Sequence, residues 1–343
     1  MKAGFLAGIG KIDIRDVPMP EIKKANEVLL KVASVGVCGS DIHYYKEGQI
    51  GSSIVEFPFR IGHEFSAIVE EVGKNVTRLK PGDRVAVDPA VFCYECDQCK
   101  AGRFNTCRTL TFMGSPKLAD GCLAEYVTIP EQCCFPSEKL AMDQLCLVEP
   151  LSIGVYAAKY ALPLEGKAVG ILGSGPIGLS TLLACKAYGA RAVYMTDKID
   201  HRVSIAIQHG ADWAGNPLKG DIVKEVTERE PFLLDAVFEC AGEQDTLDQG
   251  LFLLKPGGQF VIVGIHTINR ISFTADVLRR REISIHSVRR QNESTKDALD
   301  LIEQEKVNAD FMATHHFSID DSQKAFDTVA NYKDGVIKAI INP

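Results

Sequence analysis

The sequence predicts an α/β protein with two differently built halves, on three observations. The first 150 residues consist of short segments in which apolar and polar residues alternate, as is typical of β-strands. From about residue 151 onward, apolar strands alternate with helical segments, which indicates a doubly wound parallel sheet. A Gly-x-Gly-x-x-Gly turn joins the first of these strands to the following helix, where such sheets bind phosphate groups.

Size and charge set limits on the partners of the chain. Its 343 residues are enough for two domains with cores of their own. The net charge of −7 offers no basic surface for a nucleic acid. No apolar run reaches the length of about 18 residues that a membrane span needs, and the first residues become charged too early for a signal peptide. We therefore expect no nucleic-acid or membrane partner, and a cytoplasmic protein whose eleven cysteines remain reduced.

The first half shows few helical periods. Strands are expected at 27–32 and 66–73, and a Pro-Gly turn leads into a third strand over 80–87. Short strand segments with few helical periods predict a β-barrel or sandwich that carries long functional loops.

The second half begins with a small, apolar helical segment over 151–161. Helices are further expected over 179–189 and about 294–305, and strands at 168–172, 192–196, 235–239, 259–263 and, at the end of the chain, 336–341.

Four cysteines lie close together in the first half, spaced C-x2-C-x2-C-x7-C: Cys93, Cys96, Cys99 and Cys107. Four thiolates complete a tetrahedral shell around Zn²⁺ and leave no open position, which is the pattern of a structural zinc site. An iron–sulfur cluster is the alternative. The order of the neighbouring motifs favours zinc.

The glycine turn consists of Gly173, Gly175 and Gly178, with Pro176 and Ile177 between the last two. These glycines allow a tight turn and let the backbone approach a pyrophosphate at the helix N-terminus. A dinucleotide cofactor is therefore expected here.

A carboxylate stands at the end of the second strand of this half. Asp197 follows Gly178 by 19 residues and can accept hydrogen bonds from the adenosine ribose hydroxyls, which favours NAD over NADP. Lys198 and Arg202 lie close by and leave room for NADP, and Arg202 is a further candidate cofactor contact.

A second metal constellation precedes the four cysteines. Cys38 lies in Gly-Val-Cys-Gly-Ser-Asp-Ile-His, and His63 and Glu64 lie in Gly-His-Glu. Thiolate, imidazole and carboxylate suit a catalytic zinc, which keeps one position for water or substrate. Glu149 falls at the junction of the two halves and is a further candidate.

Taken together, these motifs resemble the zinc-containing medium-chain dehydrogenase superfamily over essentially the whole chain. Cys-Gly-Ser-Asp-Ile-His-Tyr-Tyr from Cys38 and Val-Glu-Pro-Leu-Ser around Glu149 are similar to its sorbitol (polyol) dehydrogenase branch. The resemblance implies a GroES-like catalytic domain over 1–150, completed by about 290–343, and a Rossmann domain over 151–289. It also implies two zinc ions per chain, and a homo-oligomer, with a tetramer favoured over a dimer.

The resemblance further implies roles for single residues. Cys38 and His63 would hold the catalytic zinc. Of Glu64 and Glu149, one would bind it directly and the other through water, and the sequence does not decide between them. Hydride would pass from the substrate carbon to NAD⁺, while Ser40 and His43 relay the proton to solvent.

Substrate contacts are implied for Tyr44, Phe112, Glu149 and Arg289. Sorbitol dehydrogenases tend to have a tyrosine where this chain has Arg290. Two adjacent guanidinium groups suit a carboxylate or phosphate better than a neutral polyol. The alternative is that Arg290 is a surface residue or forms an ion pair between subunits.

We therefore expect an enzyme that oxidises a secondary hydroxyl of a polyol such as sorbitol, L-iditol, xylitol or galactitol to a ketone. A hexonate (for example galactonate) or polyol-phosphate dehydrogenase and an L-threonine 3-dehydrogenase-like enzyme are the alternatives. A cofactor-binding protein without catalysis would have lost Cys38, His63 or Glu149, and all three are present.

Overall fold

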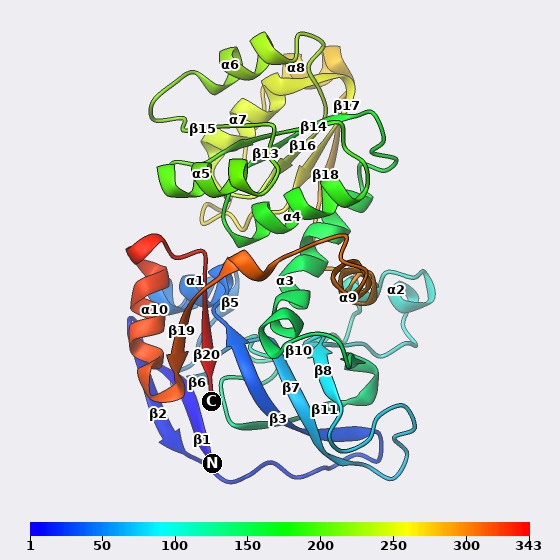
Figure 1. Ribbon diagram of the computed structural model, residues 1–343, viewed down its shortest axis with the longest axis vertical. Coiled ribbons are helices and arrows are strands. Elements are labelled where there is room, and N and C mark those ends of the chain that lie inside the picture. The colour runs from blue at the N-terminus through cyan, green and yellow to red at the C-terminus, as the bar shows by residue number, and fades with distance from the viewer. The chain divides into compact units, whose positions relative to one another are not determined.

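The computed structural model describes residues 1–343, which divide into two compact units (Figure 1). The first unit contains Met1–Glu149, Ala298–Glu303 and Ala309–Pro343, and the second contains Pro150–Asp297 and Gln304–Asn308. The sequence-based boundary near residue 290 differs from this division. Residues 290–297 fall in the second unit, where Ser294 and Asp297 contact Lys159.

The first unit is built on β-sheets. Its largest sheet has the order β12-β8-β7-β3-β20-β19, with β11 also paired to β3, and a smaller sheet has the order β2-β1-β6. The strands of the large sheet are β3 (Glu27–Gly36), β7 (Glu64–Val72), β8 (Arg84–Val87), β11 (Tyr126–Pro130), β12 (Cys134–Pro136), β19 (Ala313–Ser318) and β20 (Lys338–Asn342). The strands of the smaller sheet are β1 (Lys2–Gly8), β2 (Lys11–Asp16) and β6 (Phe59–Arg60).

Short elements surround these sheets. The remaining strands are β4 (Gln49–Ile50), β5 (Ser53–Ile54), β9 (Ala90–Val91) and β10 (Thr111–Phe112). The helices are α1 (Gly39–Glu47), α2 (Asp97–Lys100) and α10 (Ser322–Ala330). One core of buried residues, including Leu30, Phe65 and Phe326, joins the large sheet to α10, because apolar residues of the strands and of this helix face each other.

The second unit contains a six-stranded sheet in the order β15-β14-β13-β16-β17-β18, and every pair in it is parallel. Its strands are β13 (Ala168–Leu172), β14 (Ala192–Thr196), β15 (Trp213–Gly215), β16 (Leu234–Glu239), β17 (Leu254–Ile262) and β18 (Ser284–Ser287). The helices α4 (Pro176–Ala187), α5 (Asp200–Gln208), α6 (Ile222–Arg229), α7 (Gln244–Leu253) and α8 (Ala275–Arg281) connect them.

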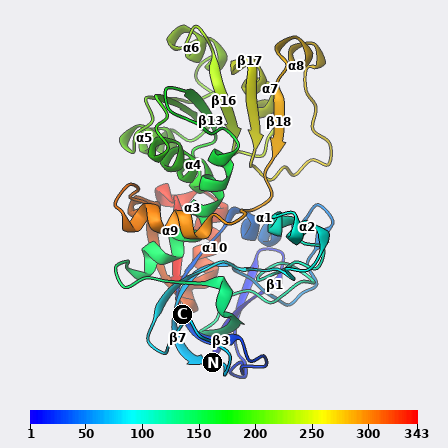
Figure 2. The same cartoon turned by 90° about the vertical axis from the view of Figure 1, so that its right-hand side faces the viewer.

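These helices cover both faces of the sheet, with α4 and α5 on one side and α7 and α8 on the other (Figures 1 and 2). Both faces are therefore buried, and the central strands are continuously apolar: all five residues of β13 are buried. The strand order reverses between β13 and β16, which is where doubly wound sheets bind ligands at the carboxyl ends of their strands. The predicted fold class is confirmed.

Several elements depart from the sequence-based expectation. The helix expected from 151 is α3 (Met142–Lys159), which begins nine residues earlier and contains Pro150 in its interior. The helix expected at about 294–305 is α9 (Thr295–Glu303), and the helix α1 was not expected. No helix of the chain is both long enough and apolar enough to cross a bilayer.

Candidate functional site

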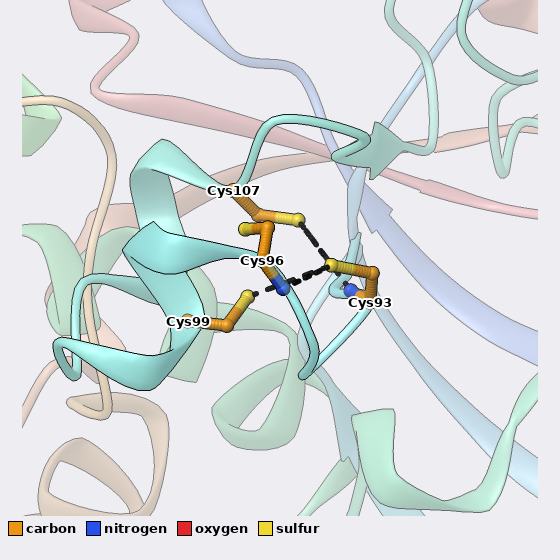
Figure 3. Close-up of side chains that lie close together, drawn as sticks. All are labelled: Cys93, Cys96, Cys99 and Cys107. Carbon is orange, nitrogen blue, oxygen red and sulfur yellow. Dashed lines mark hydrogen bonds between the residues drawn. The ribbon is translucent and has the colours of Figure 1, made fainter.

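The four cysteines of the first unit come together on a surface lobe. Their sulfur atoms all lie within 4.8 Å of one another, and Figure 3 shows the four side chains turned toward a common centre. The Sγ atom of Cys93 lies 3.5 Å from that of Cys107 and 3.9 Å from that of Cys99. Sulfur atoms held tetrahedrally at about 2.3 Å from one zinc ion lie roughly 3.8 Å apart, so the thiol set fits zinc.

The local backbone favours thiolates at two of the four cysteines, Cys93 and Cys96, whereas burial raises the pKa of Cys99. Cys96 caps the N-terminus of α2, and Cys99 lies within that helix. The backbone N–H groups of Glu95 and Cys96 lower the pKa of Cys93 to about 6. A thiolate is the form that binds a metal ion.

A second donor set lies at the junction of β3, α1 and β7. Cys38 caps the N-terminus of α1, and His63 and Glu64 lie at the start of β7; their ligand atoms are all within 4.8 Å of one another. His63 and Glu64 are buried, with 6% and 1% of their surface exposed. The structure therefore brings together three of the residues that the sequence singled out, and one thiol, one imidazole and one carboxylate suit zinc.

Two neighbours hold this set in place. The carboxylate of Asp41 accepts a hydrogen bond from the backbone N–H of Cys38 at 3.2 Å, and its other oxygen lies 3.4 Å from Nδ1 of His63. Lys338 of β20 is 1% exposed and pairs with Oε2 of Glu64 at 2.5 Å. Oε1 of Glu64 is buried and has no hydrogen-bond partner, which leaves one carboxylate oxygen of this set for a metal ion.

The electrostatics of the set follow from burial. Burial raises the pKa of the Cys38 thiol, and the negative charge of Glu64 raises it further. Burial alone would lower the pKa of His63, but Asp41 and Cys38 raise it well above its usual value. Burial also raises the pKa of Glu149, to about 8, and the charges of His63 and Glu64 act on it as well. Glu149 thus lies within electrostatic range of the set, although it is not one of the three clustered ligands.

Sequence reasoning did not assign a role to Asp41 or Lys338. Asp41 belongs to the Cys38 motif and stands three residues after the capping cysteine, the position from which a side chain can reach back to the cap. Lys338 is the one charged residue in the apolar stretch Val336–Ile341. A single charged residue in a buried strand needs a partner of opposite charge, so this lysine is the sequence feature that indicates a buried ion pair.

The remaining candidates of the first unit lie on α1 and β10. The ring of Phe112, on β10, is 5.4 Å from that of His63 between centroids. Tyr44 is 7% exposed, and its hydroxyl lies 3.3 Å from Oγ of Ser53. Ser40 and His43 are partly exposed on α1, and burial lowers the pKa of His43.

In the second unit, the glycine turn begins directly after β13. Gly173 has φ +104°, and a Cβ added at Gly178 would lie 1.8 Å from the carbonyl oxygen of Gly173. Only glycine therefore fits this close turn at the start of α4, where Pro176 is the first residue and Ile177 the second. The cradle fits a pyrophosphate at the helix N-terminus.

The carboxylate of Asp197 lies beside this turn. It accepts hydrogen bonds from the backbone N–H groups of Ser174 at 2.8 Å and Ile199 at 2.9 Å. A Cβ added at Gly175 would lie 3.5 Å from Nη1 of Arg202, so this guanidinium reaches the turn as well. Arg289 and Arg290 follow β18 in the same unit, and Arg290 has φ +55°. Such a conformation is uncommon for a residue with a side chain.

Comparison with known proteins identifies both halves of the chain. Residues 24–139 match the alcohol dehydrogenase GroES-like domain, and residues 176–304 match the zinc-binding dehydrogenase family. Sorbitol dehydrogenase of Bacillus subtilis is 33% identical over 345 residues, covering 100% of this chain and 97% of that protein. D-xylulose reductase A of Aspergillus oryzae is 33% identical over 331 residues, covering 94% of this chain and 92% of that protein.

Solved structures agree over the full length. Galactitol-1-phosphate dehydrogenase from Escherichia coli has a TM-score of 0.91 at 26% identity and covers 100% of both chains. L-idonate 5-dehydrogenase from Escherichia coli has a TM-score of 0.89 at 26% identity, covering 100% of this chain and 98% of that one. A zinc-binding dehydrogenase of Sinorhizobium meliloti bound to NADP has a TM-score of 0.91 at 30% identity, covering 100% of this chain and 99% of that one.

Proposed function

Because the chain belongs to the zinc-binding dehydrogenase family, we propose that it oxidises a secondary hydroxyl of a polyol to a ketone and transfers the hydride to NAD⁺. The family is one of oxidoreductases that use zinc and a nicotinamide cofactor. The observation that carries the proposal is the clustered set of Cys38, His63 and Glu64, in which His63 and Glu64 are buried and one carboxylate oxygen of Glu64 has no partner. The similarity to sorbitol dehydrogenase and D-xylulose reductase over nearly the whole chain supports a polyol as the substrate.

Cys38, His63 and Glu64 would hold the catalytic zinc, and Glu149 would take part directly or through a water molecule. When bound, zinc polarises the substrate hydroxyl and lowers its pKa. Lys338 supports this arrangement because it holds one oxygen of Glu64 and thereby orients the other. Asp41 orients His63 in the same way.

The proton of the substrate hydroxyl would leave through Ser40 and His43. Both lie in the helix that Cys38 caps, so they are close in sequence and in space to the metal set. Burial lowers the pKa of His43, which keeps its imidazole neutral near pH 7 and able to accept a proton.

We propose NAD, rather than NADP, as the cofactor. Asp197 lies at the end of β14 beside the glycine turn and would repel a 2′-phosphate. Arg202 could instead contact such a phosphate, and one relative of known structure binds NADP. The ratio of kcat/KM for NAD⁺ to that for NADP⁺ should fall at least tenfold in Asp197→Ala. An unchanged ratio contradicts the role of Asp197.

The second zinc ion would be structural and bound by Cys93, Cys96, Cys99 and Cys107. We expect two zinc ions per chain. Removing one thiolate by Cys99→Ser should leave about one, and Cys185→Ala, a buried cysteine of α4, should leave two. Metal analysis of the purified proteins measures this directly. Loss of both ions in Cys99→Ser contradicts the separation of the two sites.

Within this function, the substrate can be a neutral polyol or an anion. Tyr44 and Phe112 of the first unit, with Glu149, are the candidate contacts for a neutral polyol, and Arg289 and Arg290 of the second unit are the candidates for an anion. The similarity to galactitol-1-phosphate and L-idonate dehydrogenases favours keeping a phosphorylated polyol or a hexonate as the second candidate.

A substrate panel decides between them. NADH formation at 340 nm would be followed with sorbitol, xylitol, galactitol, hexonates, polyol phosphates and L-threonine. We expect turnover on the neutral polyols, with little change in Arg290→Gln. Turnover confined to anions, and lost in Arg290→Gln, would replace the neutral polyol by the second candidate. Turnover confined to L-threonine would overturn both.

The proposal also covers the oligomeric state of the protein and its location in the cell. We propose a homo-oligomer, a tetramer rather than a dimer, which light scattering of the purified protein tests. We also place the enzyme in the cytoplasm, because a reducing compartment keeps the eleven cysteines free of disulfides and leaves those of the two metal sets able to bind zinc.

A further inference from the structure

A buried carboxylate and a largely buried imidazole face each other in the second unit, whereas both candidate zinc sites belong to the first. Glu239 ends β16 and is 0% exposed, and the side chain of His266, which follows β17, is 9% exposed. Oε2 of Glu239 lies 3.7 Å from Nε2 of His266, and neither atom has a hydrogen-bond partner. Buried polar atoms without partners are rare and call for a physical cause.

The other oxygen of Glu239 organises the loop that follows β16. Oε1 accepts hydrogen bonds from the backbone N–H groups of Ala241 and Gly242, each at 2.7 Å, and from Oγ1 of Thr246 at 2.8 Å. Three donors on one oxygen fix the path of residues 240–242 and the start of α7. The carboxylate thus acts on the backbone around it.

This loop is packed against the glycine turn. A Cβ added at Gly173 would lie 3.0 Å from the backbone N of Ala241 and from the carbonyl carbon of Cys240. β13 and β16 are the neighbours between which the strand order reverses, so these two loops flank the crevice in which a doubly wound sheet binds its nucleotide. The position of residues 240–242 therefore sets the width of that crevice.

The loop that carries His266 is joined to the same point. The backbone N–H groups of Val263 and Gly264 donate to the main-chain oxygen of Glu239 at 2.8 and 2.9 Å. A Cβ added at Gly264 would lie 2.4 Å from the backbone N of Gly242 and 2.6 Å from Oε2 of Glu239. The backbones of the loop after β16 and the loop after β17 are therefore in direct contact, and a small shift of one loop moves the other.

We propose that Glu239 and His266 are a positioning pair for the nicotinamide cofactor. Glu239 holds the wall of the crevice through Oε1, and His266, 3.7 Å from Oε2, would close onto that oxygen and tie the loop after β17 to the wall. When the cofactor fills the crevice, the pair would fix the loop after β16 and the loop after β17 in position relative to each other. Neither residue need touch the reacting atoms. The proposal rests on the use of a nicotinamide cofactor and is independent of the substrate.

The test measures NADH affinity by itself. Trp213 of β15 is the one tryptophan of the chain, so energy transfer from it to NADH reports binding without turnover. In His266→Leu the imidazole is lost, and we expect the Kd for NADH to rise about tenfold, as for one lost buried polar contact. His266→Gln keeps a polar amide near the position of Nε2 and should restore most of the affinity.

Two further variants keep the result interpretable. Thr246→Val removes one of the three donors to Oε1 and should weaken NADH binding as well, even if His266→Leu folds poorly. Thr227→Val is the matched control, because the hydroxyl of Thr227 donates within α6 to the carbonyl oxygen of Val223. Zinc content should be unchanged in all four variants, since both metal sites lie in the first unit.

The outcomes separate this proposal from the assignment of the cofactor. If the unaltered protein does not bind NADH, the cofactor itself is wrong. If it binds NADH, and His266→Leu and Thr246→Val bind NADH equally well, the positioning pair alone is overturned. If His266→Leu and His266→Gln lose NADH affinity equally, and both also unfold at a lower temperature, the role of His266 is purely structural. That result would also overturn the positioning pair.

Discussion

At the scale of single residues, the arrangement around Glu64 shows how the fold stabilises a charge away from water. Lys338 and Glu64 are each 1% exposed, and the positive charge compensates the carboxylate. Burying either charge alone is costly, because the protein interior replaces the lost hydration poorly. The ion pair therefore supports the proposed metal site, and the identity of residue 338 matters although it is not itself a candidate ligand.

Replacement of Lys338 tests this interpretation. Lys338→Met leaves Glu64 buried without compensation, and we expect the free energy of unfolding to fall by about 3–5 kcal/mol, measured by urea denaturation. Lys219 is the control, because its ion pair with Asp200 is exposed and Lys219→Met should cost no more than about 1 kcal/mol. Similar losses in the two variants would contradict the special role of the buried pair.

His43 predicts a pH dependence of turnover. Burial lowers its pKa, so the imidazole is neutral at pH 7 and becomes protonated only below its ordinary value of about 6.5. A protonated imidazole cannot accept the substrate proton, so kcat should fall as the pH falls through a midpoint below 6.5. His43→Gln should be slower and should lack this limb of the pH–rate profile. An identical limb in the variant would assign it to another group.

The same ionisation affects stability with a definite sign. The unfolded chain takes up a proton on His43 at a higher pH than the folded chain does, because the folded pKa is the lower one. His43 therefore contributes less to stability as the pH falls below about 6.5.

At the scale of elements, the glycine turn and α4 were predictable because each part has a local cause. An apolar strand, a turn that only glycine fits and a helix with proline at its first position all appear in the sequence. The two donor sets were predictable for the same reason, since cysteine and histidine at such short spacings are typical of metal binding.

Other elements depend on contacts that the local sequence does not contain. Helix α1 has a mixed sequence without a clear apolar period, and its N-terminus is marked by a cysteine, Cys38, rather than by one of the usual capping residues. A helix was expected from 151 because residues 151–161 are small and apolar at helical spacing, yet α3 begins at Met142 and has Pro150 inside it. The pairing of Lys338 with Glu64 joins residues 274 positions apart, which no local pattern reveals.

The close turn at Gly178 gives a prediction for this element. A Cβ there would lie 1.8 Å from the carbonyl oxygen of Gly173, so Gly178→Ala must displace the turn from the start of α4. We expect NADH binding to weaken at least a hundredfold while the zinc content remains unchanged. Gly8→Ala is the control, since a Cβ at Gly8 meets no atom within 4 Å. Normal NADH affinity in Gly178→Ala would exclude this turn as the cofactor site.

At the scale of the whole molecule, the candidate metal and nucleotide sites belong to different units with separate cores. Both proposed zinc sites lie in the first unit, and the glycine turn lies in the second. Chelation of zinc should therefore abolish turnover and leave NADH binding within about threefold of its original affinity, because the glycine turn and the loops that flank it belong to the second unit. Hydrogen exchange should increase around the cysteine lobe and β7. Loss of NADH binding on chelation would show that the two units do not act separately.

The central claim is that the set around Cys38 is the catalytic centre of a zinc-dependent polyol dehydrogenase. The most direct measurement is the rate of NADH formation from sorbitol by zinc-loaded protein and by Cys38→Ser, with NADH affinity measured on the same samples. We predict steady turnover by the unaltered protein, none by Cys38→Ser, and equal NADH affinity in both. Turnover by Cys38→Ser near that of the unaltered protein would contradict the account.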